Sequence, residues 1–309
     1  MTVAAATPLR SAVVVGGAGA VGTMFADRLA GSGVEVRILD RVAPPPAAST
    51  GHLAFHHGDV LRLDAATLAG LHGADAVLLA LPEAAAVQAV TALAPALAPG
   101  TLLVDTLSVK APFAAALRAA GAAHLEAVGL NPMFAPMLGF VGRPVAAVVL
   151  RGGVRTQRLL ELVESWGGRV VRTTPEEHDR LMAAGQALTH AAVLAFGVAL
   201  AELDVDIADL TRIAPPPHAM MLGLLARIAA GTPTVYWDVQ AANPQAPAAR
   251  AALARGLRRI AAMVQLSDER AFEHLLLDIR EFFGDELTGH GQACARAVEA
   301  ISRQPSVAP

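Results

Sequence analysis

The residues with the clearest chemical potential form a glycine-rich turn near the start of the chain. The apolar run Ala12–Val15 leads into the segment GGAGAVG at Gly16–Gly22, and a helical pattern follows. In a turn of this kind, Gly17 allows a tight bend, Gly19 lets the backbone approach a pyrophosphate, and Gly22 lets the helix pack closely on the strand. The spacing predicts a phosphate-binding strand–turn–helix unit, although a glycine-rich turn that binds nothing would begin in the same way.

An acidic residue stands at the end of the next apolar run. Val34–Leu39 delivers Asp40 about 20 residues after the glycines, where a carboxylate can accept both hydroxyl groups of a ribose. At the start of the intervening helix, the backbone N–H groups of Ala20 and Val21 and the positive end of the dipole would face the phosphates. Glycines and acid together predict a dinucleotide site. Asp40 would repel a 2′-phosphate, so we expect NAD rather than NADP, with Arg41 partly offsetting that repulsion.

Three further polar residues follow or interrupt apolar segments. Ser108 comes after Leu102–Asp105 and stands near the carboxyl end of a strand, where open α/β sheets bind ligands; alternatively, it caps the next helix. Asn131 follows Glu126–Leu130 in the same way and is either functional or part of an ordinary Asn-Pro turn. His190 lies in an apolar helical run, where a hydrogen-bonded core histidine is commoner than a catalyst. These residues predict a dehydrogenase without specifying its substrate.

Short apolar runs alternate with helical patterns through the first part of the chain. This alternation predicts parallel β-α-β units, with helices on both faces of a doubly wound sheet, the Rossmann arrangement. The Leu81-Pro82 turn after one of these runs should border the nicotinamide side of the crevice. The predicted strands are Ser11–Val15, Glu35–Leu39, Ala76–Ala80, Leu102–Asp105, Glu126–Leu130, Val145–Leu150 and Arg169–Arg172, and the predicted helices are Gly22–Ala30, Ala84–Leu97, Pro112–Ala119 and Arg155–Ser165.

Strand patterns stop after Pro175, and only helical patterns remain. The predicted helices of this part are Glu176–Leu203, Ala219–Ala230, Tyr236–Ala242, Ala248–Gln265 and Ser267–Gly284. We therefore expect two domains, a dinucleotide-binding Rossmann domain at residues 1–174 and an all-helical domain at residues 175–309, with the boundary near Thr174.

The composition fits two domains of this kind and excludes several other classes of protein. Hydrophobic residues make up 54% of the 309 residues, and a formal charge of −3 provides no basic surface for nucleic acid. The single cysteine, Cys294, cannot form an internal disulfide. Residues 1–11 contain no signal-peptide core, and the apolar stretch Ala183–Ala201 includes Gln186 and His190, which favours a buried helix over a membrane span. We expect a cytoplasmic protein with no metal, membrane or nucleic-acid partner.

Six segments of the chain resemble, in order, the prephenate dehydrogenase family: VGGAGAVGTMFADRLAGSGVEVRILDR, DTLSVK, GLNPMFAP, EHDRLMAAGQALTH, LLARIAAGTPTVYWDV and REFFGDEL. The likeness runs from about Ser11 to Glu286. It implies an oxidative decarboxylation of a small molecule, in which a hydride leaves C4 of a cyclohexadiene for NAD while the ring carboxylate departs as CO2. It also implies that the helical domain binds substrate and forms a homodimer.

The resemblance assigns roles to five residues. Ser108 matches a serine that lines the nicotinamide and substrate site, and His190 matches a histidine of the pocket. Arg227 matches an arginine that grips a substrate carboxylate, and Tyr236 matches a tyrosine near the same place. Asn131 stands where the family usually has a histidine that acts as general base on the substrate's 4-hydroxyl group.

This departure at Asn131 changes the expected substrate. An amide has no useful basicity, but its carbonyl oxygen can accept a hydrogen bond from N–H. We therefore expect a 4-amino group, as in 4-amino-4-deoxyprephenate, and the form NPMFAP resembles family members of antibiotic pathways. One alternative is prephenate or arogenate, with His190 or a water as base. Another is a non-catalytic NAD-binding or ligand-sensing protein, which the retained Ser108, His190 and Arg227 disfavour.

Overall fold

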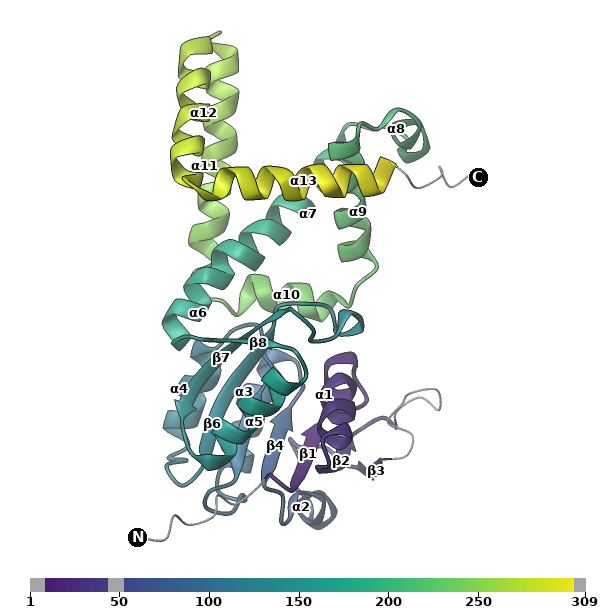
Figure 1. The fold of residues 1–309 in the computed structure, drawn as a ribbon, viewed down its shortest axis with the longest axis vertical. Coiled ribbons are helices and arrows are strands. Elements are labelled where there is room, and N and C mark those ends of the chain that lie inside the picture. Colours follow the sequence, from purple (N-terminus) through teal and green to yellow (C-terminus); the bar gives the residue numbers. More distant parts are fainter. Residues whose placement is uncertain (1–8, 44–52, 303–309) are drawn as a thin grey trace. The chain divides into compact units, whose positions relative to one another are not determined.

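The computed structural model describes residues 9–43 and 53–302. The chain divides into two compact units, Met1–Met182 with Ala241–Pro244 and Ala183–Gln240 with Gln245–Pro309 (Figure 1). The first unit extends through helix α6 (Pro175–Met182), because His178 and Asp179 of this helix are buried and hydrogen-bonded to other residues of that unit. The domain boundary near Thr174, at the start of this helix, stays a prediction.

The described part of the first unit is built on one eight-stranded sheet, with its strands in the order β3-β2-β1-β4-β5-β6-β7-β8. The chain moves outward in one direction from β1 to β3 and in the other from β4 to β8. The switch point, where sheets of this kind bind ligands, therefore lies between β1 and β4. The strands are β1 (Ser11–Val15), β2 (Glu35–Asp40), β3 (Ala54–His57), β4 (Ala76–Leu79), β5 (Leu102–Asp105), β6 (Glu126–Pro132), β7 (Pro144–Arg151) and β8 (Arg169–Arg172).

The predicted fold class, a doubly wound Rossmann domain followed by helices, is confirmed, with one correction to the parallel sheet. Strand β7 is antiparallel to β6, and Asn131 lies opposite Ala146. Residues 133–143 connect the two strands, with a short 3₁₀ turn at Pro136–Leu138. A parallel pair needs a crossover of about a dozen residues or more, usually through a helix, so this short connection returns the chain in the opposite direction.

Each face of the sheet is covered by helices and has its own apolar core. Ala12 and Val14 of β1 belong to the core formed with α1 (Ala20–Gly31) and α5 (Val154–Ser165). Their neighbours Val13 and Val15 belong to the core on the other face, formed with α2 (Ala65–Leu71), α3 (Glu83–Leu93) and α4 (Ala111–Ala119). Successive side chains of a strand point to opposite faces, so strands covered on both sides are apolar throughout.

Strand β3 and helix α2 lie where the sequence predicted no element. Ala54–His57 reads AFHH, which is neither an apolar run nor an alternation of apolar and polar residues. It forms the edge of the sheet by pairing with β2 alone, with His56 opposite Leu39. An edge strand needs no buried face on both sides, so its sequence carries a weaker signal.

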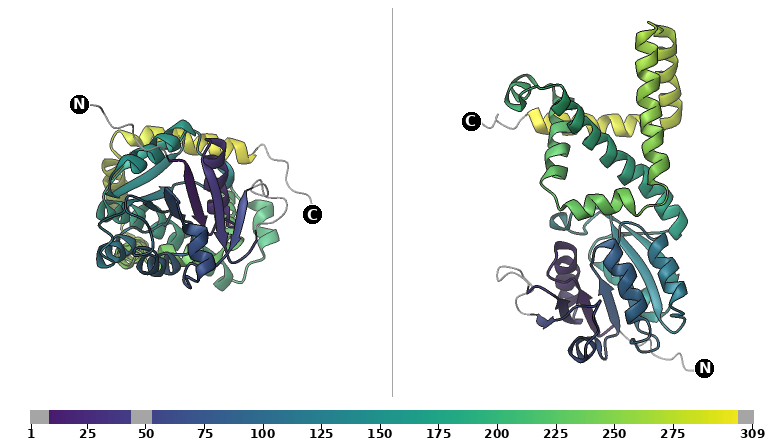
Figure 2. Two further views of the ribbon diagram at one scale, coloured as in Figure 1. Left: turned by 90° about the horizontal axis from the view of Figure 1, so that it is seen from below. Right: turned by 180° about the vertical axis from the view of Figure 1, so that it is seen from behind.

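In its described residues the second unit consists of helices. The predicted helix Glu176–Leu203 is a continuous helical run in which a π-helical turn, Ala183–Leu188, joins α6 to α7 (Thr189–Glu202). Helices α11 (Ala246–Gln265) and α12 (Glu269–Phe283) form a hairpin, seen from behind on the right of Figure 2. The other helices are α8 (Ile207–Ile213), α9 (Pro216–Ala229), α10 (Pro233–Ala241) and α13 (Glu286–Ser302), of which α8 and α13 were not predicted.

Much apolar surface of the second unit is exposed in the single chain. The exposed fraction reaches 79% at Ile213, 78% at Leu266 and 86% at Phe282. Among the described residues, one helix, Pro175–Glu202, is long and apolar enough to cross a membrane, and 17% of its most apolar stretch is buried. The expectation of a buried core helix here is wrong for the single chain, because the neighbouring helices cover only part of its surface.

Candidate active site

The turn after β1 has the geometry of a dinucleotide-binding turn, but the roles of its glycines differ from those predicted. Gly16, and not Gly17, has the left-handed backbone (φ +77°), and an added Cβ would lie 2.3 Å from the carbonyl oxygen of Ala80. Gly17 lies against Ile38, whose Cγ2 would be 2.7 Å from an added Cβ. An added Cβ at Gly22 would lie 2.3 Å from the carbonyl oxygen of Gly16. The tight bend therefore belongs to Gly16, which sequence reasoning missed.

Gly19 is less closely packed than Gly16, Gly17 and Gly22. Its nearest neighbour, the carbonyl oxygen of Gly16, would lie 3.4 Å from an added Cβ, an ordinary contact distance. Gly19 precedes α1, and no side chain caps this helix. The N–H groups of the first helical turn, including those of Ala20 and Val21, therefore have no partner within the helix and can bind an anion.

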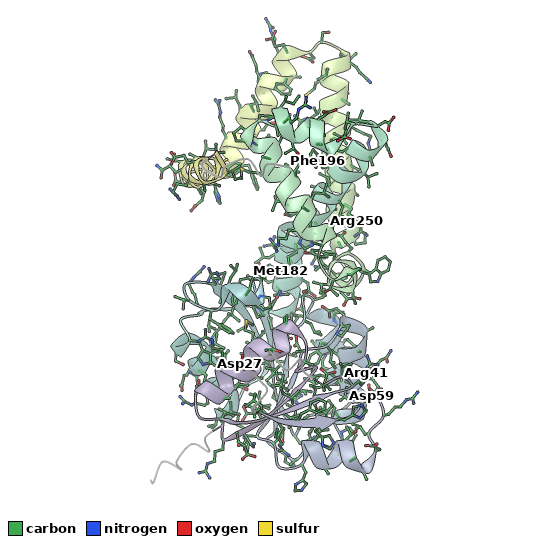
Figure 3. The ribbon with its side chains drawn as sticks, turned by 90° about the vertical axis from the view of Figure 1, so that its right-hand side faces the viewer. Asp27, Arg41, Asp59, Met182, Phe196 and Arg250 are labelled. Atoms are coloured by element: carbon green, nitrogen blue, oxygen red, sulfur yellow. The ribbon has the colours of Figure 1, made fainter. Side chains whose placement is uncertain are left out.

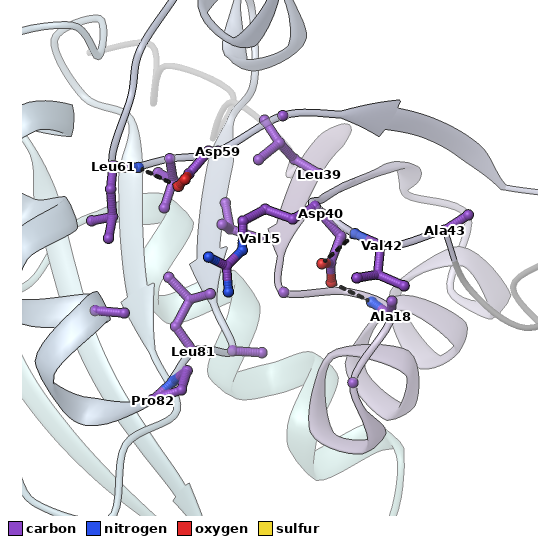
Figure 4. Close-up of a pocket in the computed structure, with 17 residues that line it drawn as sticks. Val15, Ala18, Leu39, Asp40, Val42, Ala43, Asp59, Leu61, Leu81 and Pro82 are labelled. Carbon is purple, nitrogen blue, oxygen red and sulfur yellow. Dashed lines mark hydrogen bonds between the residues drawn. The ribbon is translucent and has the colours of Figure 1, made fainter. Parts of the chain in front are cut away.

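Asp40, the last residue of β2, is held beside the same turn. Its carboxylate accepts hydrogen bonds from the backbone N–H groups of Ala18, at 3.0 Å, and Val42, at 3.2 Å (Figure 4). The two bonds fix the carboxylate in the wall of a pocket of about 540 Å³. Each oxygen keeps a further lone pair, with which it can accept a ribose hydroxyl group.

The walls of this pocket are mainly apolar and come from the carboxyl ends of β1, β2, β3 and β4. Five of the predicted cofactor residues line it: Gly19, Asp40, Arg41, Leu81 and Pro82. The other four belong to the turn and the start of α1. Arg41 and Asp59 lie at the same edge of this unit (Figure 3). Asp59 and its neighbours Gly58, Val60 and Leu61 were missed because β3 was missed. An open helix N-terminus and a fixed carboxylate in one apolar pocket fit a dinucleotide.

Ser108 lies half-buried in the loop between β5 and α4. The alternative that it caps α4 is wrong, because the cap position is Lys110 and no side-chain bond of its own closes that helix end. The cap comes from α6: the carboxylate of Asp179 accepts hydrogen bonds from the backbone N–H groups of Lys110 and Ala111, each at 2.8 Å. Ser108 is thus not needed to begin the helix.

Asn131 is buried near the end of β6, with 3% of its surface exposed. Its Nδ2 lies 3.1 Å from Nε2 of His178, and Nδ1 of that ring lies 2.8 Å from Oδ1 of Asp179. His178 and Asp179 are each 1% exposed. An amide, an imidazole and a carboxylate therefore form one buried chain of hydrogen bonds from β6 to α6. Within the described residues, Oδ1 of Asn131 forms no hydrogen bond.

A buried ion pair contacts Leu130, the residue that precedes Asn131. Nζ of Lys110 bonds to Oδ1 of Asp105 and also to the carbonyl oxygen of Leu130, at 3.0 Å. Burial raises the pKa of the Asp105 carboxyl group, and the ammonium of Lys110 opposes that shift. Gly129 leaves room for the pair, since an added Cβ would lie 2.6 Å from Oδ2 of Asp105. The pair ties α4 to the ends of β5 and β6.

Three of the predicted residues lie together in the second unit. The rings of His190 and Tyr236 are in edge contact, with their centroids 5.1 Å apart, and the Tyr236 hydroxyl group donates to the carbonyl oxygen of Arg227 at 3.5 Å. Burial lowers the pKa of the His190 imidazole, and the positive charge of Arg227 lowers it further. Nδ1 of His190 is buried without a hydrogen-bond partner among the described residues. A neutral ring with an open nitrogen can accept or donate a hydrogen bond.

The predicted residues thus divide between the units: Ser108, Asn131 and the dinucleotide turn belong to the first, and His190, Arg227 and Tyr236 to the second. Sequence reasoning missed His178 and Asp179 as partners of Asn131. Their segment, EHDRLM, resembles the family, and this likeness could have pointed to them. Its local pattern could not, because the acidic residues at this position suggest an exposed helix start. No group of three or more His, Cys, Asp or Glu side chains that could hold a metal ion occurs in the described part of the chain.

Two family models match parts of the chain. The model described as prephenate dehydrogenase, dimerization domain, matches residues 174–278, which lie mainly in the second unit. The model described as ketopantoate reductase PanE/ApbA matches residues 13–118, which include the glycine-rich turn and the pocket.

Relatives match over most of the chain. It is 53% identical over 289 residues to 4-amino-4-deoxyprephenate dehydrogenase of Streptomyces pristinaespiralis, which covers 94% of this chain and 96% of the relative. It is 31% identical to the T-protein of Enterobacter agglomerans, over 90% of this chain and 68% of that protein. The crystal structure of prephenate dehydrogenase from Aquifex aeolicus, in complex with hydroxyphenyl propionate and NAD+, shares the fold, with a TM-score of 0.72 and 18% identity over 89% of this chain and 98% of that one.

Proposed function

Because the chain belongs to the prephenate dehydrogenase family, we propose that it catalyses the NAD-dependent oxidative decarboxylation of 4-amino-4-deoxyprephenate to 4-aminophenylpyruvate. The observation that carries this proposal is Asn131, a buried amide at the position where the family usually has a histidine. The 53% identity to an enzyme named for this substrate supports it. The reaction releases the ring carboxylate as CO2 and makes the ring aromatic.

NAD, when bound, supplies the acceptor for the hydride that leaves C4 of the substrate. In the proposal, the N–H groups at the start of α1 hold its pyrophosphate, and Gly19 keeps the approach to them open. Asp40 accepts the ribose hydroxyl groups and repels a 2′-phosphate, which favours NAD over NADP. Leu81 and Pro82 line the part of the pocket that follows β4.

Asn131 is proposed to hold the 4-amino group of the substrate. A 4-hydroxyl group must lose its proton as C4 is oxidised, and a histidine at this position would take it. The amide cannot take a proton, but Oδ1 can accept an N–H hydrogen bond. The amine must be neutral when C4 is oxidised, so its ammonium form first gives up a proton to water. The neutral amine keeps its N–H protons as the hydride leaves, because the nitrogen lone pair stabilises the positive charge that develops, and the iminium that forms loses a proton afterwards. The amide therefore suits an amine and disfavours an alcohol.

Three other side chains are proposed to contact the substrate, and a fourth, Tyr236, to lie near the same place and position one of them. Ser108 lines the nicotinamide and substrate site from the loop after β5. Arg227 pairs with a substrate carboxylate, for which its planar guanidinium is well suited. His190, kept neutral by burial, offers a ring nitrogen as a hydrogen-bond partner, and Tyr236 orients that ring through their edge contact.

We further propose that the second unit forms a homodimer. The matching family model is described as a dimerization domain, and large side chains of this unit such as Ile213 and Phe282 are exposed in the single chain. A second copy that covers them would remove apolar surface from water. Light scattering should give twice the chain mass of 31.7 kDa. We also propose that the enzyme is soluble and cytoplasmic.

The decisive experiment measures NADH formation by the purified protein with 4-amino-4-deoxyprephenate and, separately, with prephenate. We expect turnover of the amine and very poor turnover of prephenate. Ordinary rates with prephenate and none with the amine would show a hydroxy substrate instead. NADH binding without turnover of prephenate, arogenate or the amine would indicate a non-catalytic sensor.

A further inference from the structure

We propose that His178 is a positioning residue: as the neutral imidazole with its proton on Nδ1, it orients the Asn131 amide so that Oδ1 is the atom presented to the substrate. This inference rests on the proposed function in one respect, the contact of Asn131 with the substrate. His178 itself is 1% exposed and contacts Asn131 through a hydrogen bond of 3.1 Å. It acts through Asn131 and does not touch the reacting atoms.

Asp179 determines where the proton of His178 lies. Both of its carboxylate oxygens accept backbone N–H groups at the start of α4, from Lys110 and Ala111 at 2.8 Å each. Two charge-assisted bonds from a helix N-terminus stabilise the ionised carboxylate, which can only accept hydrogen bonds. Nδ1 of His178 lies 2.8 Å from Oδ1 of this carboxylate, so Nδ1 must carry a proton and donate it. Nε2 faces Nδ2 of Asn131, which can only donate, at 3.1 Å, so this nitrogen is the acceptor and carries a lone pair.

A lone pair on Nε2 leaves one favourable orientation for the amide of Asn131. Its NH2 group donates to Nε2 across 3.1 Å, as the structure shows. A flipped amide would place Oδ1 against the same lone pair, lose the hydrogen bond and leave two acceptors in contact in a buried place. The orientation with Nδ2 on His178 is therefore fixed by Asp179, two hydrogen bonds away, and Oδ1 is the acceptor that remains.

The orientation bears directly on substrate choice. An acceptor can receive N–H from an amine, whereas the NH2 group of a flipped amide would meet the N–H groups of the substrate donor to donor. The same constraint would act on a histidine at position 131, whose N–H would bond to Nε2 of His178 and whose other nitrogen would face the substrate as a base. His178 thus makes position 131 an acceptor, and the residue type at that position determines whether the acceptor is also a base.

The activity test compares two substitutions at His178 on whichever substrate the wild type oxidises. His178→Gln can accept from Asn131 and donate to Asp179, so it should stay within about threefold of the wild-type kcat/KM. His178→Leu offers neither bond and frees the amide to rotate, so it should lose about tenfold to a hundredfold in kcat/KM, the effect of one buried hydrogen bond. NADH affinity, measured by binding, should be unchanged in both variants because the dinucleotide pocket is intact.

The matched control is His124→Leu, in the same unit. Among the described residues, the His124 side chain bonds only to the carbonyl oxygen of Ala94, at 3.0 Å. This variant should keep wild-type kcat/KM. If His178→Leu behaves like this control, or if Gln is no better than Leu, the positioning role is wrong. The substrate preference of the wild type tests the proposed function separately, because the comparison of the His178 variants can be made on either substrate.

A spectroscopic measurement tests the tautomer without any turnover. In protein with ¹⁵N-labelled histidine, the signals absent from His178→Gln identify His178. We expect a protonated Nδ1 and an unprotonated Nε2 at neutral pH in the wild type. A proton on Nε2 would overturn the inference, because the amide would then have to present its oxygen to His178 and its NH2 group to the substrate. This readout remains decisive even if His178→Leu fails to fold.

Discussion

The carboxylate of Asp179 accepts a hydrogen bond from the backbone N–H of Lys110 at 2.8 Å, so a residue of α6 forms the N-terminal cap of α4. The residues are far apart in sequence, and the same carboxylate also holds His178. Asp179→Ala should therefore cost about 2–3 kcal/mol of unfolding free energy, because it leaves buried N–H groups without a partner. Urea denaturation of the purified protein measures this loss.

The control for Asp179→Ala is Asp64→Ala, which removes the exposed cap of α2, where the carboxylate accepts from Thr67 N–H at 2.7 Å. Its effect should be clearly smaller, because the exposed Asp64 carboxylate caps one backbone N–H, whereas the buried Asp179 carboxylate caps two and also contacts His178. Equal losses from the two substitutions would mean that burial of the Asp179 cap adds nothing.

The buried pair of Asp105 and Lys110 should behave as a unit. Asp105→Asn leaves a buried ammonium without its counter-charge, and Lys110→Met leaves a buried carboxylate, so each should cost about 3–5 kcal/mol. The double variant removes both charges and should recover most of that loss in denaturant unfolding. Glu177→Gln, which breaks an exposed pair with Arg180, should leave the unfolding transition where it was. Additive losses in the double variant would contradict the pairing.

Two glycines of the turn after β1 should respond differently to a single added methyl group. Gly19→Ala meets only an ordinary contact at 3.4 Å, so the protein should fold normally. Its NAD affinity should fall by about tenfold or more, because the methyl group obstructs the approach to the helix N-terminus. Gly22→Ala places Cβ 2.3 Å from the carbonyl oxygen of Gly16 and should cost about 1–3 kcal/mol of stability. Calorimetric titration with NADH and thermal unfolding measure the two effects, and unchanged binding by Gly19→Ala would contradict this assignment.

The sequence predicted the fold where local pattern and tertiary environment agree. Strands β4 and β5 are buried on both faces, so their sequences are continuous apolar runs, and the switch point beside β1 follows from the glycine-rich turn. Strand β3 could not be recognised because an edge strand is stabilised mainly by pairing with its neighbour. Strand β7 is antiparallel to β6 because the connection between them is short. The patterns that identify strands and helices do not give the direction of a strand in the sheet.

The candidate site was predictable only residue by residue. Asn131 could be singled out from its place after a strand and from the family resemblance. Its bond to His178 joins residues separated by 47 positions, and nothing in either local pattern relates them. The same applies to the cap that Asp179 provides for α4, which left Ser108 as an equally good candidate for that cap. Contacts of this kind depend on the packing of α6 against β6 and α4, which sequence periodicity does not encode.

His190 should make stability depend on pH in a defined window. Burial, with the charge of Arg227, lowers its folded pKa below the unfolded reference of about 6.5. The unfolded chain then binds the proton more readily than the folded protein does. The contribution of the neutral His190 ring to the free energy of unfolding is therefore complete above about pH 6.5, and it is lost as the pH falls towards the folded pKa. Denaturant unfolding between pH 7.5 and 5.5 should show a steeper decline for the wild type than for His190→Gln. His274→Gln, at an exposed site in α12, should match the wild type; an equally steep decline in His190→Gln would contradict the prediction.

Asn131→His tests whether the amide sets the substrate. The new ring would lie where Asn131 now bonds to His178, and Nε2 of His178 can accept its N–H, so its other nitrogen would be available as a base. Prephenate turnover should then rise on the order of a hundredfold in kcat/KM, within the range of general-base catalysis, with an optimum at a pH where the new histidine is neutral. Turnover of 4-amino-4-deoxyprephenate should fall or stay level, because the amine needs no base. Asn131→Ala separates the two contributions: it removes the acceptor without adding a base, so it should lose amine turnover and gain none with prephenate. If Asn131→His gained no prephenate activity while binding NADH normally, substrate choice would have to lie in other residues of the site.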